Sequence, residues 1–205
     1  MSELRKKIID ACETLNISKI SAVLEEGVDI NETSKYGESI LSAVCSNIYN
    51  YDKDGKRYEV VKFLLDNGAD PNILEEDGIE KLGPLDSAMW AMDAEMIELL
   101  CSYGADPNAV WGLSEQESFY DFAVSEYYHE YANYNFPDNP TYEDGKTLYP
   151  MAFPEEPTAE DEKDEDSRLN FMQRMAEKYS FKEPTHLFVL RKYGAKGWRE
   201  LQGAG

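Results

Sequence analysis

One nine-residue pattern occurs twice in this chain, and it constrains the fold more than any other feature of the sequence. LLDNGADPN covers residues 64–72, and LCSYGADPN covers residues 100–108, thirty-six residues later. Glycine ends a helix at low cost because it has no side-chain carbon to oppose a left-handed backbone, and the following proline favours an extended turn. The pattern therefore predicts a structural joint that is used twice, in which a helix ends and a hairpin begins.

Similar helical segments precede four glycines of the chain. Apolar residues stand seven and four positions before each of these glycines, which are Gly27, Gly68, Gly104 and Gly194. Because residues three apart share a helix face, each segment is predicted to bury one apolar stripe. A shorter apolar pattern comes before these segments, as in residues 37–45, 82–90 and 117–125. Each unit is thus predicted to contain a short inner helix, a turn, an outer helix and a glycine-ended hairpin.

This arrangement resembles the ankyrin repeat, whose period is about 33 residues and whose signature is T-P-L-H-x-A. The resemblance is closest in GPLDSA at residues 83–88 and in GADPN at residues 104–108. The resemblance implies an all-α solenoid of about four helix-turn-helix repeats in a single domain, 1–205. The expected repeats are about 3–31, 32–72, 73–108 and 109–198. In the first and last repeats the polar residues Lys19 and His186 replace apolar ones, which predicts capping positions and a histidine at the surface or rim.

Two insertions, about 47–57 and 128–182, are predicted to leave the stack between the inner and outer helices. The longer one, in the last repeat, is acidic and rich in tyrosine. It starts with a helical stripe of aromatic residues, which indicates packing against a second predicted helix at 167–179. The proline-rich stretch between them has no periodicity and is predicted to be irregular or partly disordered. Residues 155–166 hold eight carboxylates and one lysine, which indicates a solvated, mobile loop or a contact with a basic partner.

The net charge of -21 narrows the classes of partner. Such a surface repels phosphate, so direct nucleic-acid binding is not expected, whereas a basic protein is attracted. No apolar run is long enough for a membrane span, and no signal peptide opens the chain, so we expect a cytoplasmic protein. The three cysteines, Cys12, Cys45 and Cys101, are widely spaced and fit helices, which favours buried, unreactive thiols.

Catalytic and metal-binding patterns are weak. Residues 50–61 resemble a calcium loop, but Val61 stands where the bidentate glutamate is needed, so a plain turn is the better interpretation. His129 and His186 lack metal-ligand neighbours at the usual spacing. We therefore expect no cofactor, no metal and no enzymatic activity. The enzymatic alternative would have to use the insertion at 110–185.

The predicted function is protein binding through the hairpin tips and the acidic insertion. Aromatic residues can anchor a partner, and surrounding carboxylates suit a basic one. Candidate partner-binding residues are Tyr36, Glu75, Glu76, Asp77, Trp111, Glu115 and Tyr128. Packing of Trp111 over a neighbouring hairpin remains the alternative for that residue.

The identity of the partner follows only from a further resemblance. Small acidic ankyrin proteins of bacteria are similar to this chain, and some of them are immunity proteins that block a cognate toxin. This resemblance implies a basic target such as a nuclease, bound by a protein that is a monomer when free. An adaptor, or an effector acting on host proteins, is the alternative.

Overall fold

The computed structural model describes residues 2–46, 55–75, 82–109, 117–135, 142–143, 146–147 and 153–203. The chain divides into two compact units, Met1–Glu115 (unit 1) and Gln116–Gly205 (unit 2), and each is described by itself. The described secondary structure is helical except for one pair of two-residue strands. Among the described helices, none combines the length and the apolar character needed to cross a bilayer.

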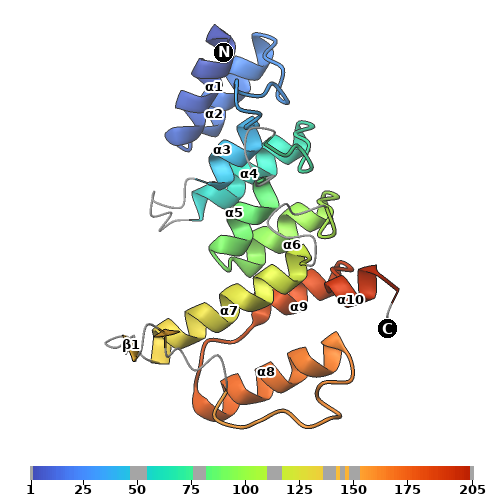
Figure 1. Ribbon diagram of the computed structural model, residues 1–205. Helices are drawn as coiled ribbons and strands as arrows, with labels where there is room; N and C mark the ends of the chain where they lie inside the picture. Colours follow the sequence, from blue (N-terminus) through green and yellow to red (C-terminus); the bar gives the residue numbers. More distant parts are fainter. Residues whose placement is uncertain are drawn as a thin grey trace. The chain divides into compact units, whose positions relative to one another are not determined.

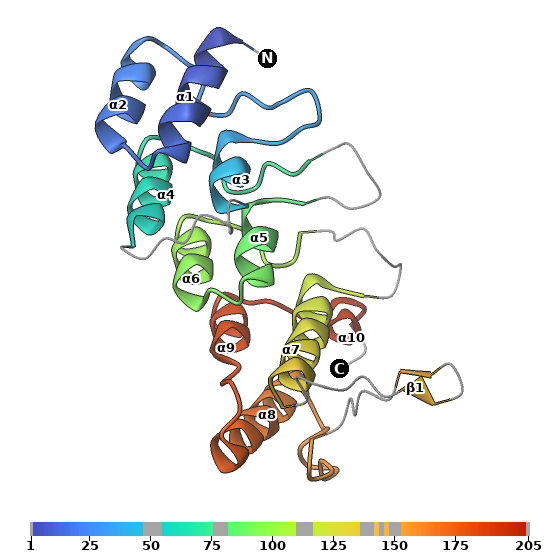
Figure 2. The same ribbon diagram turned by 90° about the vertical axis from the view of Figure 1, so that its left-hand side faces the viewer.

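Unit 1 consists of three helix pairs in its described part (Figure 1 and Figure 2). The inner helices α1, α3 and α5 pack on one another in sequence order, and each also packs on the outer helix that follows it. Figure 2 shows the described parts of the connections after α2, α4 and α6 on one side of the unit. The helices are α1 (Glu3–Glu13), α2 (Ile17–Glu25), α3 (Ile40–Cys45), α4 (Lys56–Asp66), α5 (Pro84–Trp90) and α6 (Ala94–Ser102).

Short polar side chains start most of these helices. The side chain of each N-cap residue accepts a hydrogen bond from the backbone N–H three residues later, which satisfies a donor that the helix itself leaves unpaired. The residues in this role are Ser2, Asn16, Ser39 and Asp93. Helix α5 starts differently, because the Gly83 N–H donates to the Asp86 carboxylate at 2.7 Å and Pro84 opens the first turn.

The predicted glycine stops are confirmed. Gly68 and Gly104 have φ angles of 91° and 93°, in the left-handed region that favours glycine. After each of them an alanine N–H donates to the carbonyl four residues before the glycine, Ala69 to Leu64 at 3.0 Å and Ala105 to Leu100 at 3.1 Å. The two copies of the nine-residue pattern therefore close their helices in the same way.

Asparagine side chains connect consecutive hairpins of unit 1. Asn31 donates from Nδ2 to the Gly68 carbonyl at 3.1 Å and accepts from the Asp70 N–H at 2.9 Å. Asn72, one pattern later, makes the same two bonds to Gly104 and Asp106. The last residue of LLDNGADPN thus joins its own hairpin to the next one.

The predicted apolar stripes form the core of unit 1. Ile20, Leu64, Ile97 and Leu100 come from the outer helices and have no exposed surface, and Ile8 of α1 is equally buried. Burying a side chain of this size stabilises a fold by about 1.5–3 kcal/mol. The stack is therefore held by the positions that the sequence pattern marked as apolar.

Unit 2 contains the long helix α7 (Phe119–Asn135), which packs on α9 (Thr185–Lys192), and α8 (Glu165–Tyr179), which also packs on α9. A short helix α10 (Trp198–Leu201) ends it. Strands β1 (Tyr142–Glu143) and β2 (Lys146–Thr147) pair antiparallel. This strand pair is an exception to the all-α expectation, in a stretch predicted to be irregular.

The described tyrosines of the predicted aromatic stripe are buried, as expected, but α7, which carries them, packs mainly on α9 rather than on the predicted helix at 167–179. Tyr120 and Tyr127 of α7 are 1% and 0% exposed, and the Tyr127 hydroxyl donates to the Lys182 carbonyl at 2.5 Å. Phe153 lies among three other rings, those of Tyr128, Phe171 and Phe181, with centroid distances of 5.3 to 6.4 Å. Unit 2 is thus built around an aromatic cluster.

The prediction that His186 lies at the surface or rim is wrong. Its side chain is 1% exposed, its ring centroid lies 5.9 Å from that of Tyr127, and its Nε2 atom has no hydrogen-bond partner among the described residues. Burial, with a smaller effect from Lys182, lowers the pKa of His186 from 6.5 to about 3. Since the histidine is buried in the neutral form, it serves as a packing residue.

Candidate interaction surface

A buried arginine fixes the first hairpin of unit 1. Arg5 of α1 is 2% exposed, and its guanidinium donates to the backbone carbonyls of Glu32 at 3.3 Å and Glu38 at 2.8 Å. Ser2 adds two bonds to the Glu32 carboxylate, from its N–H at 3.1 Å and from its hydroxyl at 2.6 Å. The start of α1 therefore holds both arms of this hairpin.

The tip of that hairpin is a tight turn organised by Ser34. Its N–H donates to the Glu38 carbonyl at 2.8 Å, and its hydroxyl accepts from the N–H groups of Tyr36 and Glu38, both at 3.2 Å. A serine hydroxyl bound to its neighbouring backbone is a common way to stabilise a turn. The backbone of Tyr36 is consequently held in place while its side chain is not covered.

Tyr36 is the most exposed large hydrophobic side chain among the described residues, at 52%. The Lys35 ammonium lies 4.4 Å from the centroid of its ring, within the distance of a cation–π contact. An aromatic ring presented on a fixed backbone loses little conformational entropy on binding, which makes it a suitable anchor for a partner.

A cleft of about 320 Å³ separates the first hairpin from the second. Residues 33–37 line one side of it, and Ile73 and Leu74 line the other. The next residue, Glu75, donates its N–H to the Leu82 carbonyl at 2.8 Å. Burial raises the pKa of Glu75, and the charge of Glu38 raises it further. The two carboxylates, from neighbouring hairpins, are therefore close enough to repel each other.

Of the predicted site residues, Tyr36 lines this cleft, and Glu75 directly follows Leu74, which lines it from the second hairpin. Tyr128 belongs to unit 2, where its ring packs on Phe153 and is half buried. Four others lie outside the described residues and stay predictions: Glu76, Asp77, Trp111 and Glu115.

Comparison with known proteins identifies the kind of repeat. The family model described as ankyrin repeat matches residues 36–76, from Tyr36 through α3 and α4 to the second hairpin. An ankyrin repeat protein of Acanthamoeba polyphaga mimivirus is 31% identical to this chain over 93 residues. The chain contains an ankyrin repeat. The matched stretch covers 45% of this chain and 11% of the viral protein.

Ankyrin repeats are protein-interaction modules, and the two hairpins described above stand at the ends of the matched repeat.

Glu38 and Lys35 were not among the predicted site residues, although both flank Tyr36 in the sequence. Arg5 was also missed, yet its spacing could have revealed it. It lies three residues before Ile8 and seven before Cys12, which places all three on one buried face.

Most of the acidic segment, residues 155–166, is exposed, as predicted, but it makes specific contacts within unit 2. The Asp161 carboxylate accepts from the N–H and hydroxyl of Thr158 and from Arg174 at 2.6 Å, and these bonds lower its pKa to about 2. Glu155 accepts from Lys178 and from the Tyr179 hydroxyl. The basic residues of the C-terminal part thus neutralise some of the charge that a partner was expected to meet.

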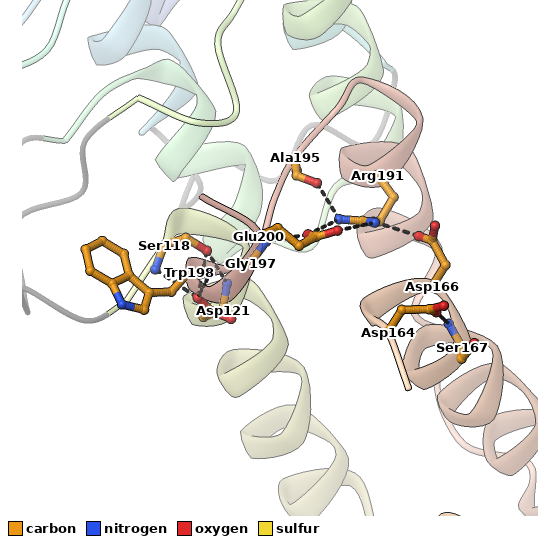
Figure 3. Close-up of polar contacts among 10 residues, drawn as sticks. All are labelled: Ser118, Asp121, Asp164, Asp166, Ser167, Arg191, Ala195, Gly197, Trp198 and Glu200. Carbon is orange, nitrogen blue, oxygen red and sulfur yellow. Dashed lines mark hydrogen bonds and ion pairs between the residues drawn. The ribbon is translucent and has the colours of Figure 1, made fainter. Parts of the chain in front are cut away.

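Arg191 of α9 links three elements of unit 2 (Figure 3). Its guanidinium binds Asp166 at 2.8 Å, the Glu200 carboxylate at 2.6 and 3.1 Å and the Ala195 carbonyl at 2.8 Å. Burial alone would lower the pKa of Arg191, but the bonds to Glu200 and Asp166 raise it above the usual value. Asp121 of α7 adds a second link by accepting from the Trp198 N–H at 2.7 Å.

The described part of the ankyrin chain offers no group of three or more metal-ligating side chains. The first five residues of the calcium-loop resemblance, 50–54, lie outside the described residues, and its last six belong to α4. The prediction of buried thiols is confirmed for all three cysteines. Burial raises the pKa of Cys12 and Cys45 to about 12 and that of Cys101 to about 11, so these thiols stay protonated at neutral pH.

Proposed function

We propose that this chain is a non-catalytic module that binds a basic protein partner through the first and second hairpins of unit 1. The observation that carries the proposal is Tyr36, exposed on a hairpin that the buried Arg5 fixes to α1. Glu38 follows Tyr36 on the same hairpin, and Glu75 stands on the next hairpin, within range of the charge of Glu38. An aromatic anchor with an acidic surround favours a basic surface.

Photo-crosslinking in cells can test this surface and capture the partner in the same experiment. A benzoylphenylalanine is placed at position 36 and, as a matched control, at position 58, because Tyr58 of α4 is also exposed, at 38%. In cells of the source organism we expect one predominant adduct with a basic protein when the probe is at position 36. The same adduct should be absent when the probe is at position 58. Equal adducts at both positions, or none at position 36, would reject the surface.

A finer proposal concerns the nature of that protein. We infer a cognate toxin with a basic active cleft, such as a nuclease, that a monomeric cytoplasmic chain blocks directly. The net charge of -21 supports this class of partner. Co-expression with the product of each flanking gene, followed by purification, tests it. A tight complex that abolishes nuclease activity is expected, whereas a partner with an acidic surface would favour the adaptor or effector alternative.

A further inference from the structure

A second pocket lies between the inner helices α1 and α3 of unit 1. Its volume is about 220 Å³. This exceeds the roughly 150 Å³ of an engineered cavity that holds benzene, but it lies below the range for drug-sized ligands, about 300–1,000 Å³. The pocket is therefore large enough for one side chain of a partner and too small for a larger ligand.

Most of the side chains that line this pocket are apolar. They come from α1, from the turn that follows it and from α3, and they are Ile9, Cys12, Leu15, Ala43 and Val44. Cys12 adds no charge, because burial raises the pKa of its thiol to about 12. An aliphatic lining of this kind suits the methylene stem of a lysine or arginine, whose charged end must then meet anions.

Two carboxylates, those of Glu13 and Glu38, line the same pocket. Glu13 is exposed at the end of α1, and no ion pair among the described residues includes it. Glu38 comes from the first hairpin and lies 3.6 Å from Arg5, whose guanidinium bonds instead to the carbonyls of Glu32 and Glu38. Both carboxylates are therefore able to accept hydrogen bonds from an added cation.

A guanidinium also lines the pocket, that of Arg57 at the second position of α4. Burial raises the pKa of Cys45 and the charge of Arg57 opposes this rise, which places Arg57 near the last residue of α3. Glu38 precedes the first residue of α3. An incoming cation thus meets two attractive charges and one repulsive charge, so loss of the Arg57 charge should strengthen its binding.

From this lining we infer that the pocket takes a lysine or arginine side chain of the basic partner. The stem packs on Ile9, Leu15 and Ala43, and the cation meets the carboxylates. The inference rests on the proposed function and deepens it, because it names the chemical group that is recognised. Since Glu38 is two residues from Tyr36, one partner can contact the hairpin tip and the pocket together.

A peptide titration followed by NMR tests the pocket. The probe is acetyl-Gly-Arg-Gly-amide, and two control peptides replace the arginine. One carries citrulline, the neutral isostere, and the other carries an arginine analogue shortened by two methylenes. We expect the probe at millimolar concentration to shift the amide resonances of residues 9–15 and 43–44, and each control to bind several-fold more weakly. Equal shifts from the probe and either control, or shifts spread evenly over the acidic surface, would overturn the inference.

Charge variants identify the carboxylate contact. Glu13→Gln should weaken binding of the arginine peptide about tenfold, which corresponds to about 1.4 kcal/mol, whereas Arg57→Gln should strengthen it. Glu25→Gln is the matched control, since Glu25 is exposed on α2 and its replacement changes the net charge equally. An equal loss for Glu13→Gln and Glu25→Gln would overturn the site.

A filled pocket gives a test that leaves the charge unchanged. Ala43→Leu places a larger side chain in the pocket and should abolish binding of the arginine peptide, whereas Ala22→Leu, at an exposed position of α2, should not. Unaltered binding in Ala43→Leu would overturn the inference. If the pocket failed these tests while crosslinking through position 36 still captured a basic protein, the proposed function would stand without it.

Discussion

Asn72 accepts a hydrogen bond from the N–H of Asp106 at 2.8 Å and so couples one hairpin of unit 1 to the next. Its amide nitrogen also donates to the Gly104 carbonyl at 2.9 Å. The same pair of bonds joins Asn31 to the second hairpin. One side chain thus satisfies a donor and an acceptor of the following repeat. Only asparagine and glutamine carry a side-chain amide that offers both an N–H donor and a carbonyl acceptor, and glutamine is longer by one methylene.

Replacement of this asparagine should destabilise unit 1. In Asn72→Ala the Gly104 carbonyl and the Asp106 N–H lose their partner, so we expect the free energy of unfolding to fall by about 1–3 kcal/mol. Urea denaturation measures the change. Asn67→Ala is the control, because the Asn67 side chain donates one bond, to Phe63 of its own helix. A loss for Asn72→Ala no larger than that for Asn67→Ala would show that the hairpin link is not a source of stability.

Relief of backbone strain should stabilise the turn between α5 and α6. Met92 adopts a φ of 49°, in the left-handed region that its side-chain carbon disfavours. Ala91 lies in the right-handed helical region. Met92→Gly should therefore raise the free energy of unfolding by about 0.5–1 kcal/mol, and Ala91→Gly should lower it by a similar amount. Thermal denaturation of the two variants shows whether stability rises or falls in each. A loss of stability in both would contradict the expected backbone strain at Met92.

Acid should destabilise the protein through His186. The pKa of His186 is about 3 in the folded chain and about 6.5 when unfolded, so the unfolded state takes up the proton first. The contribution of the neutral histidine is present above pH 6.5 and is lost as the pH falls towards 3. The loss reaches roughly 3–5 kcal/mol. His186→Leu should remove this part of the pH dependence, which denaturant titrations at pH 7, 5 and 4 would reveal.

The control for that experiment is His129→Leu, because the His129 side chain is 57% exposed. We expect this variant to keep the acid sensitivity of the original chain. If both leucine variants lose stability in acid as steeply as the unmodified protein, the burial of His186 is not its cause.

Removal of the Arg191 side chain should release the two ends of the network in Figure 3. Arg191→Ala leaves Glu200 and Asp166 without their cation, and we expect faster hydrogen exchange at the start of α8 and in α10, with a stability loss of about 2–3 kcal/mol. Arg199→Ala, an exposed change of equal charge on α10, should have little effect. Unchanged exchange in Arg191→Ala would mean that α8 and α10 are held by apolar packing alone.

Sequence patterns predicted the parts of the fold that depend on local spacing. The left-handed glycines, the apolar stripes and the hairpin positions follow from helix periodicity and turn chemistry, and each is found at the expected residues, as for Gly68 and Leu64. Tyr36 and Glu75 were selected for the same reason, because hairpin tips are visible in the sequence. Contacts between distant segments were not predictable in this way.

Apart from Arg5, Lys35 and Glu38, the missed features depend on such distant contacts. The burial of His186 reflects its neighbours in space, whereas its place in the repeat suggested exposure because one side of a terminal repeat faces water. The ion pairs of Asp161 and Glu155 join residues 13 and 23 positions apart, so a run of carboxylates alone could not reveal them. The closeness of Glu38 and Glu75 likewise appears only when two hairpins are placed side by side.

The asparagine joint also governs how such a protein changes in length. Because the side chains of Asn31 and Asn72 each bond to the hairpin that follows, a whole repeat can be inserted or deleted between two joints without altering the side-chain bonds of any other joint. Each insertion would add one more tip to the row, with its own sequence. Evolution can therefore vary the number of tips and the residues on them separately, since the joint residues and the tip residues are different ones.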